Sequence, residues 1–274
     1  MSSTLTTSIS RLTNSKYSSE QDILAIEEPL EIRLSFVNVI ERIEKNLSVT
    51  MRTPGNDEEL ALGFLFTEGI INNMDQILSI SKPGVNNILI QFDEDVKFEM
   101  SKLEKHFYTS SSCGVCGKTS IESINTINSP VNNSPSIKFN ADLIYKFPGI
   151  LRTKQSVFEQ TGGLHASAIF NVKGDLILLR EDVGRHNALD KLIGSALQNN
   201  LLPLENNLLL LSGRASFELI QKATMAGIRI VAAIGAPSSL AVDLAKERGM
   251  TLIGFLKNDK LNIYCGKERV IIEY

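Results

Sequence analysis

The sequence predicts an α/β protein in which the C-terminal half is a mixed sheet with flanking helices and the smaller N-terminal half is an α+β subdomain. In the first half, apolar and polar residues alternate in short segments, which is the period of half-buried strands. In the second half, short apolar segments alternate with segments of helical spacing that end at glycine. This second pattern is typical of a parallel sheet covered by helices.

The N-terminal half begins with a segment rich in Ser and Thr. Its composition predicts a disordered tail over residues 1–19. Alternation then predicts strands over residues 30–36 and 47–51, and a further strand over residues 88–92. The first half is therefore expected to be mainly sheet.

A helix is expected between the second and third of these strands, capped by Asn56 or Asp57. Its apolar face consists of Leu60, Ala61, Phe64 and Leu65. Asn, Ser and Pro dominate residues 125–136, a composition that buries little apolar surface. We therefore place a boundary there, between subdomains over residues 20–136 and 137–274.

The C-terminal half begins with two apolar runs, residues 164–172 and 176–179, whose Lys–Gly connection indicates an antiparallel hairpin. Helical spacing follows at Leu189, Leu192, Ile193, Ala196 and Leu197. From there the pattern is strand, helix, strand, helix and strand, over residues 208–211, 216–226, 228–234, 239–248 and 251–256. This order predicts that the hairpin joins a parallel sheet, which makes the sheet mixed.

Composition narrows the function classes. The chain has 274 residues and a net charge of -3, which gives no electrostatic reason to expect a nucleic-acid partner. It shows no signal-peptide pattern and no run of roughly 18 apolar residues, so we expect a cytoplasmic protein with no membrane partner. Three cysteines, two of them three positions apart, do not form a disulfide framework; in a reducing compartment they indicate redox, metal or sulfur chemistry.

Ligands of open α/β sheets bind beyond the carboxyl ends of the parallel strands, where loops and helix N-termini meet. This rule selects residues 212–214, 235–239 and 257–260. Two glycine-containing turns, Arg214 and the lysines of the third segment would suit an anionic ligand such as a phosphorylated nucleotide. Ordinary turns that carry surface charges are the alternative.

The segment that follows the predicted hairpin contains many ionisable groups. Asp182 can cap the next helix, and Asp190 and Lys191 can be its solvated face. His186 lies in this segment, and His165 lies at the entrance to a strand, so both histidines can approach one crevice. A structural role for each histidine is the alternative.

Cys113 and Cys116 lie in a loop of small residues that leads into a possible helix, which favours exposure. A thiolate near a helix N-terminus and beside Lys118 would have a depressed pKa, and the thiolate is the form that attacks a persulfide or binds a metal. The alternatives are inert loop cysteines, a zinc site and a phosphate loop. A phosphate loop would need glycine where Ser112 stands.

Zinc would need two further ligands, and the chain offers only Cys265 and three histidines. The zinc deaminase pattern has a Glu two positions after a His, but Ser167 and Ala188 occupy those positions here. Sulfur chemistry is therefore the sharper hypothesis for the cysteine pair.

Seven motifs in the same order resemble the FdhD family of formate dehydrogenase accessory proteins. They are residues 51–55, 57–65, 111–117, 161–165, 181–187, 212–218 and 236–242. The resemblance implies a cytidine-deaminase-like fold without the deaminase zinc site and without a protein-bound metal. It also implies a sulfurtransferase of the persulfide-carrier type.

In that scheme the protein accepts sulfur from a cysteine desulfurase and passes it to Mo-bis(molybdopterin guanine dinucleotide) before the cofactor enters formate dehydrogenase. Cys113 matches the cysteine that holds the persulfide, and Cys116 would assist or resolve it. A non-catalytic chaperone that only holds the molybdenum cofactor is the alternative function. A homodimer is compatible with either function.

The resemblance also implies a cofactor-binding segment made of Phe255, Leu256, Lys257, Asn258, Asp259 and Lys260. Asn258 stands where the family commonly has Gly, and Lys257 and Lys260 stand where Arg is common. Lysine keeps the positive charge but lacks the bidentate fork of arginine. Cys265 lies outside the matching cysteine pair and is expected to be structural.

Overall fold

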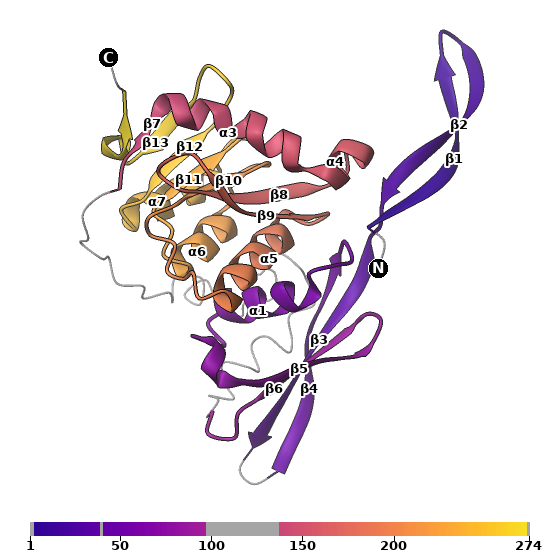
Figure 1. The fold of residues 1–274 in the computed structure, drawn as a ribbon, viewed down its shortest axis with the longest axis vertical. Helices are drawn as coiled ribbons and strands as arrows, with labels where there is room; N and C mark the ends of the chain where they lie inside the picture. Colours follow the sequence, from indigo (N-terminus) through magenta and orange to yellow (C-terminus); the bar gives the residue numbers. More distant parts are fainter. Residues whose placement is uncertain (1–2, 39–40, 97–136, 273–274) are drawn as a thin grey trace.

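The computed structural model describes residues 3–38, 41–96 and 137–272. Strands β1 (Thr4–Thr13) and β2 (Lys16–Ala25) form an antiparallel hairpin that projects from the body of the molecule (Figure 1). The prediction of a disordered tail is therefore wrong for the described residues up to 19. Thr favours extended backbone, and the two turn residues, Asn14 and Ser15, adopt the positive φ that a tight hairpin requires.

The N-terminal sheet has the strand order β4-β3-β6-β5, in which β3 and β6 are parallel. Its strands are β3 (Glu28–Asn38), β4 (Glu41–Arg52), β5 (Ile77–Gly84) and β6 (Asn87–Phe92). Helix α1 (Asp57–Thr67) packs its apolar face on this sheet in one buried cluster, and a 3-10 turn, η1 (Met74–Gln76), leads into β5. These elements confirm the predicted strands and helix, with Asn56 at the N-cap.

The C-terminal sheet is mixed, as predicted, with the order β13-β12-β11-β10-β8-β9. Its central strands β10 (Leu208–Leu211), β11 (Ile230–Ala233) and β12 (Thr251–Gly254) are parallel. The predicted hairpin, β8 (His165–Phe170) and β9 (Leu176–Asp182), pairs with β10 through β8 and runs antiparallel to it. Strand β13 (Asn262–Cys265) closes the other edge. The cytidine-deaminase-like arrangement stays a prediction.

Helices cover both faces of this sheet (Figure 1). On one face lies α3 (Ala141–Lys154), followed by α4 (Ser156–Thr161). On the other face lie α5 (Arg185–Gln198), α6 (Phe217–Met225) and α7 (Ser239–Glu247), which confirm the predicted helices of this half. A short parallel pair, β7 (Phe139–Asn140) with β14 (Val270–Ile271), and the turn η3 (Lys267–Arg269) complete the described elements.

The two halves meet where α1 crosses α5 (Figure 1). A glycine on each helix lets the backbones touch at this crossing. A Cβ on Gly63 would lie 1.8 Å from the carbonyl oxygen of Asp190, and a Cβ on Gly194 would lie 1.8 Å from that of Glu59. Helix α1 is thus packed between the N-terminal sheet and α5. The predicted boundary at residues 125–136 lies outside the described residues, and the division into subdomains stays a prediction.

Candidate functional site

The loops that follow β10, β11 and β12 are joined by backbone hydrogen bonds into one continuous layer. The amide of Gly235 donates to the carbonyl of Gly213 at 3.0 Å, and the amide of Phe255 donates to the carbonyl of Gly235 at 3.1 Å. Residues 213–215 and 236–238 are held together by two further bonds of this kind. The three strand-end segments selected from the sequence are therefore adjacent in space.

Glycine is needed in this layer because the backbones and one ring approach closely. A Cβ on Gly235 would lie 2.9 Å from the carbonyl oxygen of Gly213. A Cβ on Gly213 would lie 3.2 Å from the Nδ1 atom of His165, so the imidazole ring rests against the backbone of this loop. The loop is fixed to β8 as well, since the amide of Ala166 donates to the Ser212 hydroxyl at 2.8 Å.

His165 is held in a largely neutral state. Burial lowers its pKa, and the positive charges of Arg185 and His186 lower it further, while Asp182 acts in the opposite direction. An imidazole in this state can accept a proton or a hydrogen bond near neutral pH.

His186 contacts the same loop from the first turn of α5. Its Nε2 atom lies 3.3 Å from the Ser216 hydroxyl and 3.4 Å from Oε2 of Glu218. The hydrogen bond from His186 lowers the pKa of Glu218 to about 2, against the effect of burial. The two histidines therefore lie against one segment, residues 212–218, as predicted.

Arg185 directly precedes His186 in the chain and is only partly exposed. Its Nε atom is buried and has no hydrogen-bond partner. We refer to His165, Arg185, His186, Ser216 and Glu218 as the strand-end cluster. Sequence reasoning singled out both histidines and left open whether they, Arg185 or Arg214 contact the cofactor, but it did not single out Glu218, although this residue lies in a family motif.

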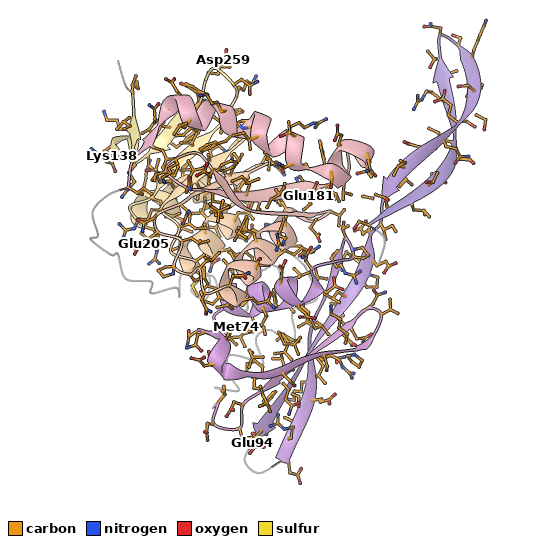
Figure 2. The ribbon with its side chains drawn as sticks, in the orientation of Figure 1. Met74, Glu94, Lys138, Glu181, Glu205 and Asp259 are labelled. Carbon is orange, nitrogen blue, oxygen red and sulfur yellow. The ribbon has the colours of Figure 1, made fainter. Side chains whose placement is uncertain are left out.

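The predicted cofactor segment follows β12 as a turn, in which the amide of Lys257 donates to the carbonyl of Lys260 at 2.8 Å. Phe255 is 44% exposed and has a φ of 52°, which is unusual for an aromatic residue. Leu256 is only 1% exposed, so its side chain belongs to the core. Residues 257–260 are exposed, and Asp259 lies at the outer part of the loop (Figure 2).

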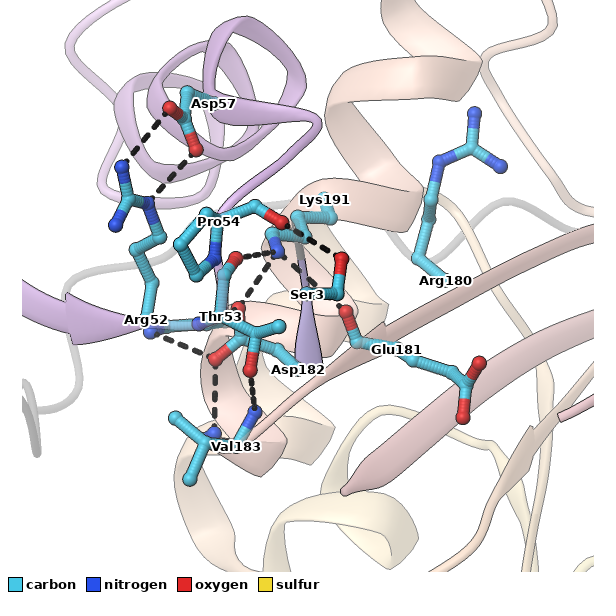
Figure 3. A network of polar contacts seen from close by, with 12 residues as sticks. Ser3, Arg52, Thr53, Pro54, Asp57, Arg180, Glu181, Asp182, Val183 and Lys191 are labelled. Atoms are coloured by element: carbon cyan, nitrogen blue, oxygen red, sulfur yellow. Dashed lines mark hydrogen bonds and ion pairs between the residues drawn. The ribbon is translucent and has the colours of Figure 1, made fainter. Parts of the chain in front are cut away.

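A second group of charges is buried where the two halves meet, and the alternative of a solvated face for Asp190 and Lys191 is wrong. Both side chains are 2% exposed. The Nζ atom of Lys191 lies 2.7 Å from Oδ2 of Asp182 and donates to the carbonyl of Thr53 at 2.8 Å (Figure 3). Asp182 accepts from the amides of Thr53 and Gly184. The N-cap of α5 is Gly184 and no side chain caps this helix, so the prediction that Asp182 caps it is wrong.

Lys222 of α6 is the centre of a neighbouring buried group. Its Nζ atom lies 2.9 Å from both carboxylate oxygens of Asp190 and 2.8 Å from the Thr67 hydroxyl. Burial raises the pKa of Asp190, against the lowering effect of Lys222. Burial would lower the pKa of Lys222, but Asp190 and Glu68 outweigh it and raise the pKa, so the ammonium group stays charged.

Two arginines complete this buried region. Arg52 is 0% exposed and makes a bidentate contact with Asp57, through distances of 2.9 and 3.1 Å. Arg180 of β9 makes a bidentate contact with Glu59 of α1. We call these four ion pairs, Asp182–Lys191, Asp190–Lys222, Arg52–Asp57 and Arg180–Glu59, the junction network. Periodicity predicted none of them, because long-range partners leave no local pattern.

Cys113 and Cys116 lie outside the described residues, so the cysteine pair stays a prediction. Over residues 3–38, 41–96 and 137–272, no group of three His, Cys, Asp or Glu side chains is arranged to hold a metal ion. Cys265 is half-buried, and burial raises the pKa of its thiol. Within the same residues, no helix combines the length and the apolar character that a membrane crossing requires.

This chain is similar to known proteins over almost its whole length. The model of the FdhD/NarQ family matches residues 25–271. A protein of Streptomyces coelicolor named "Sulfur carrier protein FdhD" is 46% identical over 272 residues, covering 96% of this chain and 94% of the relative. One of the same name from Saccharolobus solfataricus is 41% identical and covers 95% of both chains.

A solved structure supports the fold. The crystal structure of a formate dehydrogenase accessory protein from Desulfotalea psychrophila superposes with a TM-score of 0.72. It covers 98% of this chain and 99% of the other, at 23% identity. This likeness establishes a shared mixed α/β architecture.

Proposed function

Because the chain belongs to the FdhD/NarQ family, we propose that it is a sulfur carrier for the maturation of formate dehydrogenase. It accepts sulfur from a cysteine desulfurase as a persulfide on Cys113. It then passes the sulfur to Mo-bis(molybdopterin guanine dinucleotide), which is the form inserted into formate dehydrogenase. The observation that carries this proposal is the match to relatives named sulfur carrier proteins over 96% of the chain.

The transfer chemistry needs the two cysteines, the persulfide donor and a thiol reductant that restores the pair after each transfer. The Cys113 thiolate attacks the terminal sulfur of the donor's persulfide, a new S–S bond forms, and the donor cysteine leaves as a thiolate. Cys116 then attacks the Cys113 sulfur, so that a Cys113–Cys116 disulfide forms and the carried sulfur leaves at the oxidation level of sulfide. The reducing cytoplasm, where we place the reaction, returns the pair to thiols.

The strand-end layer supplies the surface on which we place the cofactor. Residues 255–260 present an exposed aromatic ring, a tight turn and two lysines. Such groups suit a guanine base and its phosphates, since a ring can stack and lysines pair with phosphate oxygens. The cytidine-deaminase-like fold and a homodimer remain part of this proposal.

Intact-mass measurement after incubation with a cysteine desulfurase and cysteine tests the proposal. We expect the protein to gain the mass of one sulfur atom, and a reductant should remove it. The Cys113→Ala variant should gain none, whereas Cys265→Ala, which removes the half-buried third cysteine, should behave like the wild type. Sulfur uptake that persists in Cys113→Ala would reject the assignment.

A non-catalytic chaperone for the molybdenum cofactor is the second candidate. The exposed turn at residues 257–260 favours it as well, because binding the cofactor does not require a persulfide. The two candidates differ in the cysteine pair: a chaperone retains its function in the Cys113→Ala variant. Activation of formate dehydrogenase in cells that lack their own family member, complemented by each variant, separates them.

A further inference from the structure

The β1–β2 hairpin stands apart from both larger sheets of the molecule. It projects from the body, and among the described strands β1 and β2 pair only with each other (Figure 1). Its base is fixed, because the amide of Ile26 donates to the carbonyl of Ser3 at 2.9 Å and the Ser3 hydroxyl donates to the carbonyl of Pro54 at 3.3 Å. Beyond this base, its main contact with the described body is that of β2 with α4. Strand β1 therefore offers an open edge along most of its length.

The hairpin exposes apolar side chains on both of its faces. Leu5 is 58% exposed and lies opposite Leu24, and Leu12 is 57% exposed and lies opposite Tyr17. Because successive side chains of a strand point to opposite faces, the Leu5 pair and the Leu12 pair lie on opposite faces. A partner packed on one face would cover only one pair, whereas an added strand extends both faces. The hairpin is thus suited to the addition of a strand at its edge.

The outer edge of β1 lacks the features that keep strands from pairing with other chains, which are charges, prolines and bulges. Residues 5–10 carry no charge, and the charge of Arg11 is paired with Glu20 of β2 at 2.7 Å. All ten residues of β1 pair with β2 without a register shift. The strand is therefore regular and uncharged over most of its edge.

The edges of the neighbouring N-terminal sheet are protected by comparison. Strand β4 has four charged residues between positions 41 and 45, and its pairing with β3 shifts register. Strand β5 contains Pro83, and its pairing with β6 shifts register twice. Within the hairpin itself, β2 carries a lysine and two acidic residues. The unprotected edge is thus a particular property of β1.

We propose that β1 pairs with β1 of a second copy of this chain, antiparallel and about a two-fold axis, so that the two hairpins form one four-stranded sheet. This names the surface of the homodimer that the proposed function includes, and it rests on that part of the proposed function. A strand that meets its own copy about such an axis closes the assembly at two chains. Residues 5–10 then face an equally uncharged segment, so no like charges are opposed. Two strands alone are marginally stable in water, and four strands are not.

The size of this contact sets its strength. Strands of ten residues meet over roughly 33 Å, and a sheet with its side chains is roughly 10 Å thick. The area buried on each copy is then on the order of 300–400 Å², compared with about 800 Å² per partner in a stable complex. We therefore expect a reversible dimer that exchanges with monomer at micromolar concentrations.

Two serines that lie opposite each other provide matched variants. Asn14 and Ser15 both have positive φ, as in the two-residue turn whose closing pair is hydrogen-bonded. The pairs alternate from there, which places Ser10 and Ser19 in a pair that is not hydrogen-bonded, with both amides directed outward. Ser10→Pro therefore removes a donor from the outer edge of β1, and Ser19→Pro removes one from the outer edge of β2. Neither variant removes a bond between the two strands.

Analytical ultracentrifugation of the untagged full chain over a range of concentrations gives the dissociation constant of the dimer. A reductant in the buffer excludes dimers linked by disulfides. We expect the wild type to pass from monomer to dimer, Ser10→Pro to raise the dissociation constant about tenfold or more, and Ser19→Pro to leave it within about twofold of the wild type. The proposal is overturned if the wild type stays monomeric throughout the micromolar range, if Ser10→Pro does not weaken the dimer, or if both variants weaken it equally.

Amide hydrogen exchange of the wild type tests the edge without any substitution. The outward amides of Thr6, Ser8 and Ser10 should exchange more slowly at high protein concentration than at low concentration. The amides of Thr7 and Ile9, which are directed towards β2, should change much less. A dimer in which the outward amides show no such dependence is formed by another surface, and this result also overturns the proposal. Neither measurement requires a persulfide, so the dimer surface and sulfur transfer fail or succeed independently.

Discussion

The junction network and the strand-end cluster are two charged regions of one molecule, and they differ in how their charges are matched. In each of the four ion pairs of the junction network, a side-chain nitrogen lies no more than 2.9 Å from a carboxylate oxygen. In the strand-end cluster, Arg185 has a buried nitrogen without a partner among the described residues. Of the matched pairs, Arg180–Glu59 joins the two halves directly, and Lys191 and Lys222 join them through hydrogen bonds to Thr53 and Thr67.

This difference has an energetic basis. Burying an ion is expensive, and a partner at hydrogen-bond distance offsets most of that cost, so a complete pair adds specificity more than stability. Removing one member of such a pair leaves an uncompensated charge in the interior. Variants of the junction should therefore lose more stability than variants at the strand ends.

The largest effect is expected at Lys222. Lys222→Met leaves Asp190 buried without its ammonium partner, which should lower the free energy of unfolding by about 3–5 kcal/mol in denaturant titrations. Because burial raises the pKa of Asp190, its protonation relieves part of this loss as the pH falls.

Lys146→Met on the exposed side of α3 is the matched control, and it should change stability by less than about 0.5 kcal/mol. Replacing both Asp190 and Lys222 by apolar residues should recover much of the loss, since no charge is then left unpaired. Equal stability of Lys222→Met and Lys146→Met would show that the pair does not hold the junction.

The contact between α1 and α5 at Gly63 and Gly194 gives a second test of the junction. Gly63→Ala places a methyl group 1.8 Å from the Asp190 carbonyl, so the helices must separate, and we expect a loss of about 3 kcal/mol. Gly149→Ala in α3 has nothing within 4 Å of the new methyl group and should gain about 0.5–1 kcal/mol. Chemical denaturation of both variants checks this contrast, which fails if Gly63→Ala is tolerated.

A smaller effect, confined to acid, is expected at Glu218. Its pKa of about 2 lies below the ordinary value of 4.5, so its carboxylate stabilises the fold above 4.5 and loses this contribution as the pH falls towards 2. Glu218→Gln should therefore be less stable near neutral pH by on the order of 2 kcal/mol, with a deficit that shrinks in acid.

Unfolding free energies measured at several pH values test this dependence. Glu247→Gln is the control, because that carboxylate is 66% exposed at the end of α7. A deficit of Glu218→Gln that stays constant from neutral pH to acid would contradict the assigned hydrogen bond with His186.

Much of the fold could be predicted from local patterns. Alternation located β3, β4 and β6, and the glycines after α6 and α7 marked the helix ends. The tail prediction failed because β1 and β2 are stabilised mainly by pairing with each other, and a threonine-rich hairpin with large exposed side chains resembles a polar tail in composition.

Only part of the candidate site could be predicted from the sequence. The strand-end rule located the loops after β10, β11 and β12, because topology alone fixes where the carboxyl ends meet. Asp190 and Lys191 were assigned a solvated face as one alternative, since sequence cannot show that α1 and Lys222 cover them. That the Nε atom of Arg185 has no hydrogen-bond partner among the described residues becomes visible only in three dimensions.

Transfer of labelled sulfur tests the central claim most directly. The wild-type protein is loaded with radioactive sulfur by a cysteine desulfurase, freed of donor, and mixed with the molybdenum cofactor and formate dehydrogenase that lacks it. The account predicts that label leaves the protein and appears with the cofactor as formate oxidation begins, and that Cys113→Ala gives neither. Activation of the enzyme while the label stays on the protein, or equal activation by Cys113→Ala, would contradict the carrier function.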